Sequence, residues 1–357
     1  MIVRDEQEML QRAISSFKGL AEEVVIVDTG SIDDTIAVAE SLGARVVRHE
    51  WRDDFSAARN AGFDAATGEW VFALDADEHL LPDSREEVKR LTAVEDPAQG
   101  YLVTRRDVTQ GGVSEMMFFR LGRRDLNRRL VGRIHEHFEP PLTQVQKSGI
   151  VIQHEGYARG NLEAKLRRNV RLLEMELADR PTQPYYLADL AHSYRQLGDS
   201  RWPSVLDQTM QAIDLEADRS PLVLMPALLE MALTADSSTL PKNLTPAQLE
   251  ALADRWYPSS VPLLAARCRL AFGGGEMARA AELGERAAKA WDTESYDRTM
   301  SFNPAIVGAE FRLNLGAALA RSGRFEEALI RFAEADSDPQ FEQVARQNAD
   351  AVRAAMG

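Results

Sequence analysis

The chain has 357 residues, which is long enough for two domains with cores of their own. Its composition, 45% hydrophobic and 27% charged, is that of a globular protein, and its net charge of −14 argues against a general nucleic-acid binder. Neutral or cationic partners, or a metal ion, suit this charge better. The single cysteine, Cys268, excludes an intrachain disulfide and a zinc site built on cysteines. Because no apolar run approaches the roughly 20 residues of a membrane span, we expect no transmembrane segment and a cytoplasmic location.

The first 80 residues alternate strand and helix patterns. Apolar, β-branched runs predict strands, and the helical spacing of apolar residues predicts helices between them. The predicted strands are residues 1–3, 23–28, 44–47 and 70–74, and the predicted helices are residues 6–20, 33–42 and 55–66. This order implies a parallel sheet with right-handed crossovers. Ligands of such sheets bind at the carboxyl ends of the strands, where Asp28 and Asp75 stand.

The rest of the chain changes character near residue 160. Short strands, predicted at residues 100–104, 116–121 and 150–153, precede that point, and almost only helical patterns follow it. We therefore predict an α/β domain over residues 1–160 and an α-helical domain over residues 161–357.

The helical part contains spacings typical of tetratricopeptide repeats, in which small residues let two helices approach. The best match is Leu315, Gly316, Leu319, Gly323, Phe325, Ala328, Phe332 and Ala335, with Phe332 filling the gap between the helices. A second unit shows only its first helix clearly, at Leu190, Tyr194 and Gly198, because we expect Trp202-Pro203 to interrupt the other helix. A third, degenerate unit is indicated by Gly275, Ala280 and Ala287. The alternative is a generic α-helical domain.

The predicted strand at residues 70–74 runs directly into the carboxylates of Asp75, Asp77 and Glu78. Because the strand pattern predicts full burial, these charges reach the edge of a low-dielectric core and need a cation there. An arginine, a helix N-terminus or a divalent metal would supply it. Asp75 and Asp77 are two residues apart, so an extended segment places them on the same side. Their hard oxygen atoms suit Mg²⁺ or Mn²⁺, and the alternative is an exposed acidic loop.

Four segments, taken in order, resemble the family 2 glycosyltransferases. They are Met1–Glu6, Val25–Thr35, Asp54–Asn60 and Leu74–Glu78. These enzymes are inverting, use nucleotide-sugars and have the GT-A fold, with a Rossmann-like mixed sheet. The subgroup that the chain resembles carries a C-terminal tetratricopeptide-like domain and includes the peptide S-glycosyltransferases that modify bacteriocins. The resemblance spans the predicted α/β domain and the helical tail.

The resemblance implies a donor site at the strand ends. In this site Asp28 accepts hydrogen bonds from the uracil or the ribose, Arg59 reaches the base or the phosphates, and Asp75 lies near the ribose. Arg4 and Glu6, in the first of the four segments, also belong to the donor site. Without the resemblance, Asp28 is equally a turn or helix-capping residue, and Arg59 is equally a solvated helix arginine.

The same resemblance assigns a metal ion, Mn²⁺ or Mg²⁺, to Asp77. There the ion would neutralise the leaving UDP as a Lewis acid. His154 is then the third metal ligand that GT-A enzymes often place late in the domain, and the alternative for His154 is a structural role.

Two histidine-containing segments, Gly132–His137 and Ile152–Tyr157, resemble the acceptor-side and closing segments of the subgroup. An inverting transfer needs a carboxylate or an imidazole to take the acceptor's proton during attack on the anomeric carbon. Glu136 or His135 would serve, and the sequence does not decide between them. The alternative for His135 is a core or surface histidine without a catalytic role.

The arginines and the first strand add two further expectations. Eight arginines fall between Arg105 and Arg133, and a diphosphate or an acidic acceptor would use some of them. The family's first strand usually begins several residues before Ile2-Val3. The start of this chain is therefore trimmed, or the edge of its nucleotide pocket is incomplete.

These features predict a metal-dependent inverting glycosyltransferase. It would move a sugar from a nucleotide-sugar, by resemblance a UDP-sugar, to a peptide, protein or glycan acceptor. The helical tail would offer an extended surface to such an acceptor, to a lipid-linked one, or to a second subunit such as another copy in a homodimer. Two alternatives are a non-catalytic scaffold with a decayed transferase fold and a nucleotidyltransferase. The intact acidic pair disfavours the scaffold, and the lack of glycine in Arg4–Gln7 disfavours the nucleotidyltransferase.

Overall fold

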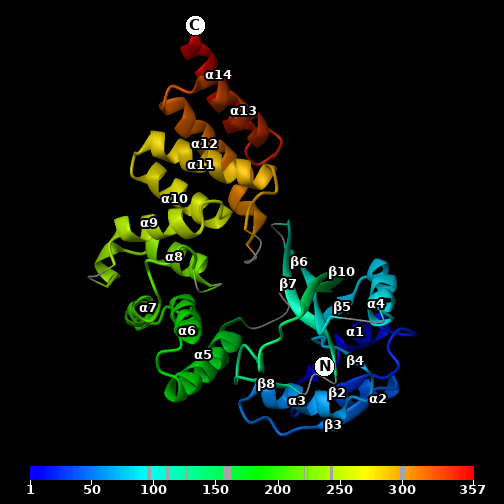
Figure 1. The fold of residues 1–357 in the computed structure, drawn as a ribbon. Coiled ribbons are helices and arrows are strands. Elements are labelled where there is room, and N and C mark those ends of the chain that lie inside the picture. Colours follow the sequence, from blue (N-terminus) through cyan, green and yellow to red (C-terminus); the bar gives the residue numbers. More distant parts are fainter. Residues whose placement is uncertain are drawn as a thin grey trace. The chain divides into compact units, whose positions relative to one another are not determined.

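A computed structural model describes residues 1–94, 98–109, 112–124, 128–155, 162–220, 222, 224–241, 244–297 and 302–357. The chain divides into two compact units, Met1–Asp179 and Arg180–Gly357 (Figure 1). The domain boundary that the sequence predicts, after residue 160, lies outside the described residues. Within the described ranges, no helix is both long enough and apolar enough to cross a membrane.

The first unit begins with a parallel sheet of three short strands in the order β1-β2-β3. The strands are β1 (Ile2–Val3), β2 (Val25–Asp28) and β3 (Arg45–Arg48), and the accompanying helices are α1 (Leu10–Ser16), α2 (Thr35–Ser41) and α3 (Phe55–Ala65). The β-branched side chains of β2 drive this arrangement, because Ile26 and Val27 are fully buried. The alternation of strands and helices that the sequence predicts is confirmed.

A second sheet has five strands in the order β4-β7-β6-β10-β5. They are β4 (Trp70–Phe72), β5 (Glu78–Leu80), β6 (Gly100–Thr109), β7 (Gly112–Arg123) and β10 (Val145–His154). β6 and β10 are parallel, whereas the other neighbouring pairs are antiparallel. This mixed sheet agrees with the predicted fold class, although β6, β7 and β10 are longer than the short strands expected there.

The placement of β4 corrects the sequence analysis. We expected this strand to continue the parallel sheet, but it pairs antiparallel with β7, with Trp70 opposite Arg123. The expected full burial of residues 70–74 is also wrong, because only Leu74 among them is buried. The physical reason is the number of backbone N–H and C=O groups that each neighbouring strand can offer to β4. β1 has two residues and pairs with β2, whereas β7 offers β4 a strand of 12 residues.

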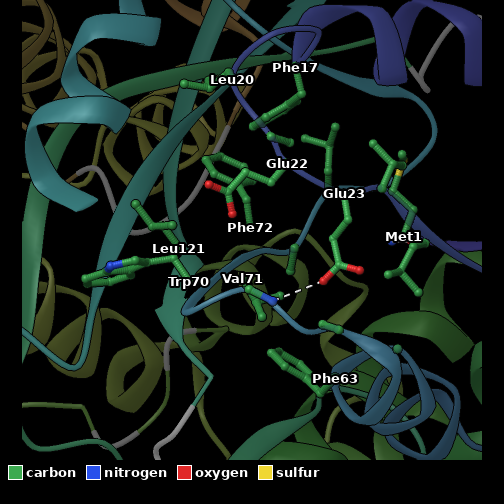
Figure 2. A pocket seen from close by; sticks show the side chains of 18 of the residues that line it. Met1, Phe17, Leu20, Glu22, Glu23, Phe63, Trp70, Val71, Phe72 and Leu121 are labelled. Atoms are coloured by element: carbon green, nitrogen blue, oxygen red, sulfur yellow. Dashed lines mark hydrogen bonds between the residues drawn. The ribbon is translucent and has the colours of Figure 1, made fainter. Parts of the chain in front are cut away.

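A cavity of about 430 Å³ lies between β1 and β4. Its lining comes from both sheets and from the ends of α1 and α3, and it includes Met1, Phe17, Phe63, Phe72 and Leu121 (Figure 2). The two strands line the same cavity but belong to different sheets. The first unit therefore has two sheets where the sequence suggests one.

The remaining elements of the first unit are a small hairpin and two helices. β8 (Arg129–Val131) and β9 (His137–Glu139) form the hairpin, and its five-residue connection, Gly132–Glu136, is called the hairpin loop below. A 3₁₀ turn at Pro82–Ser84 leads into α4 (Arg85–Thr92), which packs against β10. The last element of the unit is α5 (Leu162–Asp179).

The second unit is helical over its described residues. Its elements are α6 (Pro184–Gln196), α7 (Trp202–Gln211), α8 (Met225–Leu233), a 3₁₀ turn (Ser237–Thr239), α9 (Pro246–Trp256), α10 (Val261–Gly273), α11 (Met277–Asp292), a second 3₁₀ turn (Pro304–Val307), α12 (Ala309–Arg321), α13 (Phe325–Asp336) and α14 (Glu342–Met356). The three predicted helix pairs, α6–α7, α10–α11 and α12–α13, each pack together. One expectation is wrong: Trp202-Pro203 begins α7 instead of interrupting it, because proline fits the first turn of a helix.

The contact between α12 and α13 depends on the missing side chain of Gly316. This glycine faces Phe332, whose ring is 2% exposed. A Cβ atom at Gly316 would lie 2.6 Å from Phe332 Cε1, well inside the distance at which carbon atoms pack. The small residue therefore lets the ring fill the space between the helices, as the repeat spacing predicts.

Gly316→Ala should destabilise the second unit by about 1–3 kcal/mol, because overpacking forces the Phe332 ring or a helix to move. Adding Phe332→Leu should restore part of that loss. The matched control is Gly273→Ala, because a Cβ atom at this exposed end of α10 meets nothing within 4 Å. Helix propensity predicts a gain of up to about 1 kcal/mol for the control. Urea unfolding measures all three variants, and an unchanged stability for Gly316→Ala would contradict the packing described.

Candidate active site

The carboxylate of Asp75, which follows β4, is held by two arginines. Arg59 of α3 donates from Nη2 to Asp75 Oδ1 at 3.2 Å, and Arg120 of β7 donates from Nη2 to Asp75 Oδ2 at 2.9 Å. Burial by itself would raise the pKa of Asp75, but the two guanidinium groups outweigh it and hold that pKa well below its usual range. The cation that the sequence requires at the end of this strand is therefore a pair of arginines.

Arg120 also pairs with Glu78 Oε1 at 2.5 Å, so that one guanidinium group serves two carboxylates. Glu78 is 1% exposed, and its burial raises its pKa against the opposing charge of Arg120. The sequence analysis placed Arg120 in the arginine cluster without giving it this role. The sequence does contain an indication of this role, because Arg120 is the one charged residue in the apolar run Met116–Leu121. A charge in such a run needs a buried partner.

Arg59 connects Asp75 to the hairpin loop. Its Nε donates to Oε1 of Glu136, the last residue of that loop, in an ion pair in which both side chains are largely buried. The structure thus places Arg59 between two carboxylates, and the alternative of a solvated helix arginine is wrong. The predicted base Glu136 is brought beside Asp75. His135, the other predicted base, precedes it with a φ of 56°, which is uncommon for a residue with a side chain.

Asp77 and His154, the two residues that the resemblance assigns to a metal ion, lie in contact with each other. His154 Nε2 is 3.2 Å from Asp77 Oδ2, and His154 Nδ1 is 2.6 Å from Asp107 Oδ1. Burial disfavours protonation of His154, but the bonds to Asp107 and then Asp77 outweigh it and raise the pKa of His154 to about 9. Sequence reasoning missed Asp107, which comes from β6 and is 1% exposed. Within the described ranges, no three His, Cys, Asp or Glu side chains are grouped to hold a metal ion by themselves.

Asp28, the last residue of β2, is 4% exposed, and its carboxylate closes a turn. Oδ2 accepts from the backbone N–H of Gly30 at 3.1 Å, and Oδ1 accepts from the backbone N–H of Ser31 at 3.2 Å. The turn role that the sequence allows is therefore present. Oδ2 also accepts from Ser31 at 3.3 Å, whereas Oδ1 has a second lone pair that leaves a contact with a nucleotide open.

Arg4 and Glu6 lie in the loop after β1, which is bonded to the loop after β2. The backbone N–H of Ile32 donates to Asp5 Oδ1 at 2.7 Å, and this bond links the two loops. Glu6 is half-buried, and its burial, followed by the negative charge of Asp77, raises the pKa of Glu6 to about 7. Glu6 therefore belongs to the Asp77 side of the site, whereas Arg4 is exposed.

The first 152 residues match the family model described as Glycosyl transferase family 2. Residues 1–152 are thus similar to the family 2 glycosyl transferases. The resemblance that the four sequence segments suggested is confirmed, and the domain contains most of the site described above. His154 and the helix α5 lie just beyond the matched residues.

Three relatives show how much of the chain is shared. A TPR repeat-containing protein of Synechococcus elongatus is 36% identical over 219 residues, which cover 57% of this chain and 54% of that protein. The SPbeta prophage-derived glycosyltransferase SunS of Bacillus subtilis is 25% identical over 200 residues, covering 52% and 46%. An uncharacterized glycosyltransferase of Rickettsia conorii is 36% identical over 93 residues, covering 26% and 33%. The chain thus spans about half or less of the length of these relatives.

Arg120→Met should cost about 3–5 kcal/mol of stability at pH 8, because it leaves Glu78 buried without its cation. The loss should be smaller at pH 5. Without Arg120 the raised pKa of Glu78 rises further, and a group with a raised pKa contributes stability at low pH that is lost as the pH rises. The control is Arg106→Met, which breaks a half-exposed pair with Glu115 and should cost less than about 1 kcal/mol. Urea unfolding at both pH values measures the loss of stability. Equal losses at pH 5 and pH 8 would contradict the role of Arg120 as the cation that compensates Glu78.

Proposed function

We propose that this chain is an inverting glycosyltransferase that uses Mn²⁺ or Mg²⁺ and a UDP-sugar, and that its acceptor is a peptide, protein or glycan. The main support for the proposal is a pair of linked ion pairs within the residues that match the family model. Arg59 binds Asp75 with one nitrogen and Glu136 with another. It joins a carboxylate at the donor side to a carboxylate in the loop expected to face the acceptor. A non-catalytic scaffold would have no need of this arrangement.

For the donor, we propose that Asp28 and Asp75 accept hydrogen bonds from the uracil and the ribose. The N–H group of uracil and the ribose hydroxyls are donors, and carboxylates are acceptors only. Arg59 would act indirectly, because its guanidinium group already holds Asp75 and Glu136. Glu6 and Arg4 would flank the diphosphate side of the same site.

For the metal, the residues present fit a divalent ion at Asp77 and His154. A ligating histidine typically donates its other ring N–H to a carboxylate, and Asp107 takes that position at His154 Nδ1. This leaves His154 Nε2 directed at Asp77. A carboxylate oxygen with an imidazole nitrogen favours Mn²⁺ over Mg²⁺, because Mg²⁺ prefers oxygen ligands. When bound, the ion would neutralise the diphosphate of the leaving UDP.

For the chemistry, Glu136 would act as the general base. The acceptor's nucleophilic atom attacks the anomeric carbon and gives its proton to Glu136, while the bond from that carbon to the diphosphate oxygen breaks on the opposite face. One displacement inverts the configuration. Arg59 holds Glu136 Oε1, and in this proposal that bond would orient the carboxylate toward the acceptor. His135 remains the alternative base, and a loss of activity in His135→Gln but not in Glu136→Gln would assign it the role.

Asp77→Asn should abolish Mn²⁺-dependent binding of UDP and lower donor hydrolysis by at least about a hundredfold, because one metal ligand loses its charge. The control is Asp83→Asn, an exposed carboxylate after β5, which should behave as the parent does. The measurements are calorimetry with UDP and Mn²⁺, and hydrolysis of a panel of UDP-, GDP- and TDP-sugars. Near-parental hydrolysis in Asp77→Asn would exclude the metal assignment, and a parent that hydrolyses no sugar of the panel would exclude the proposed function.

The second unit, by this proposal, presents an extended surface to the acceptor, as repeat domains do. Deletion of residues 180–357 should therefore spare donor hydrolysis yet lower transfer to a peptide or protein acceptor by more than about tenfold. A longer deletion that also removes α5 should lose both activities, because α5 belongs to the first unit. Comparing hydrolysis with transfer in soluble truncations separates these cases. Equal loss of both activities after the shorter deletion would make the second unit structural only.

A further inference from the structure

The helix α5 carries a buried carboxylate, Glu176, that the matched family domain does not include. This side chain is 4% exposed although it is charged. Its neighbours on the buried face of the helix, Val170, Leu172 and Leu173, are apolar. A buried carboxylate lowers the stability of the fold unless it is hydrogen-bonded. The groups that bond to Glu176 therefore indicate its role.

The partners of Glu176 are both in the hairpin loop. Its Oε1 accepts from the backbone N–H of Arg133 at 2.6 Å and lies 3.5 Å from the Arg133 guanidinium group. A charge-assisted bond to a backbone N–H fixes the main chain, not only a side chain. Arg133 is three residues before Glu136, so Glu176 holds the backbone that leads to the proposed base.

α3 is attached to the loop at Arg133 and to the strand before it at Leu130. The carbonyl of Arg133 accepts from the backbone N–H of Phe55 at 3.0 Å. The side chain of Asn60 bonds to both backbone groups of Leu130, just before the loop, at 2.8 and 3.1 Å. α3 also carries Arg59, which binds Glu136 at the far end of the loop. The loop is therefore held between α3 and α5.

α5 contacts the start of α3 as well. Its Arg171 pairs with Asp53, and the guanidinium group of Arg168 lies 5.0 Å from the centre of the Phe55 ring. Asp53 and His135 both have a φ of 56°. Such backbone conformations persist only where the surroundings determine them, and α5 supplies part of the surroundings of Asp53 through Arg171.

We propose that Glu176 is a positioning residue for the transfer reaction: it fixes the hairpin loop so that Glu136 meets Arg59 in the orientation that takes the acceptor's proton. The proposal rests on the proposed function of Glu136. It extends the functional unit past residue 152, to a helix that touches neither donor nor acceptor in this scheme.

The test compares three substitutions in the full chain. Glu176→Leu should lower kcat for donor hydrolysis about 10- to 100-fold, because a small displacement of a reacting group costs that much. Its affinity for UDP with Mn²⁺ should stay at the parental value. Glu176→Gln should recover most of the activity, since the amide oxygen still accepts from Arg133. Asp179→Asn is the matched control, because Asp179 binds the same arginine at 2.9 Å from an exposed position, and it should leave kcat unchanged.

Hydrogen exchange gives a second readout that does not depend on activity. In Glu176→Leu, the amides of residues 133–136 should exchange at least about tenfold faster, while those of β6 and β7 stay protected. If the parent hydrolyses no sugar donor, the proposed function fails, and the exchange data still decide whether Glu176 holds the hairpin loop. If Glu176→Leu does not fold, Glu176→Asp replaces it, because the shorter carboxylate keeps the charge but should lose the bond and the activity.

Parental kcat and parental exchange in the Leu variant would overturn the proposal. So would a parallel loss of kcat, UDP affinity and thermal stability, because that pattern marks a residue that only supports the fold. Failure of the Gln variant to recover activity would show that the charge of Glu176, and not its bond to the loop, is what matters.

Discussion

The first unit depends on the neutralisation of Asp75 at the edge of its core. The side chain of Asp75 is 34% exposed, and the buried part of its charge is unfavourable unless cations compensate it. Arg59 and Arg120 supply the compensation from α3 and β7, elements that are distant in the sequence. α3 packs on the parallel sheet and β7 belongs to the mixed sheet. The two ion pairs therefore join the sheets beside the cavity where β1 and β4 do not pair.

This constraint also separates the roles of two carboxylates that stand two residues apart. Both oxygens of Asp75 accept from guanidinium groups, and the positive charge of these groups would repel a metal ion at Asp75. Asp77 instead faces His154, a group that can lose its proton. The carboxylates of Asp77 and Asp107 both favour the protonated imidazole, so an ion bound at the proposed metal site would have to displace that proton. An alternating pattern predicts that Asp75 and Asp77 share a side, but their division of roles depends on which distant residue reaches each.

Local structure could be predicted from the sequence, and long-range pairing could not. Repeat spacing correctly places Gly316 against Phe332, because both belong to one helix pair and the spacing is a local property. The pattern of a strand predicts which of its faces is buried, but not which strand lies beside it. For that reason the pairing of β4 with β7, the role of Arg120 and the contact of Asp107 with His154 all had to come from the structure.

The hairpin loop shows how far this dependence on distant residues extends. It is five residues long, and both Gly132 and His135 have positive φ values, which short-range preferences do not maintain for a histidine. Its shape is determined from outside, by Arg59 and Phe55 on one side and by Glu176 on the other. The geometry of the proposed base thus depends on groups from two helices outside the loop. Since α5 begins beyond residue 152, a catalytic domain cut to the family match would keep the base and lose one of the supports that hold it in place.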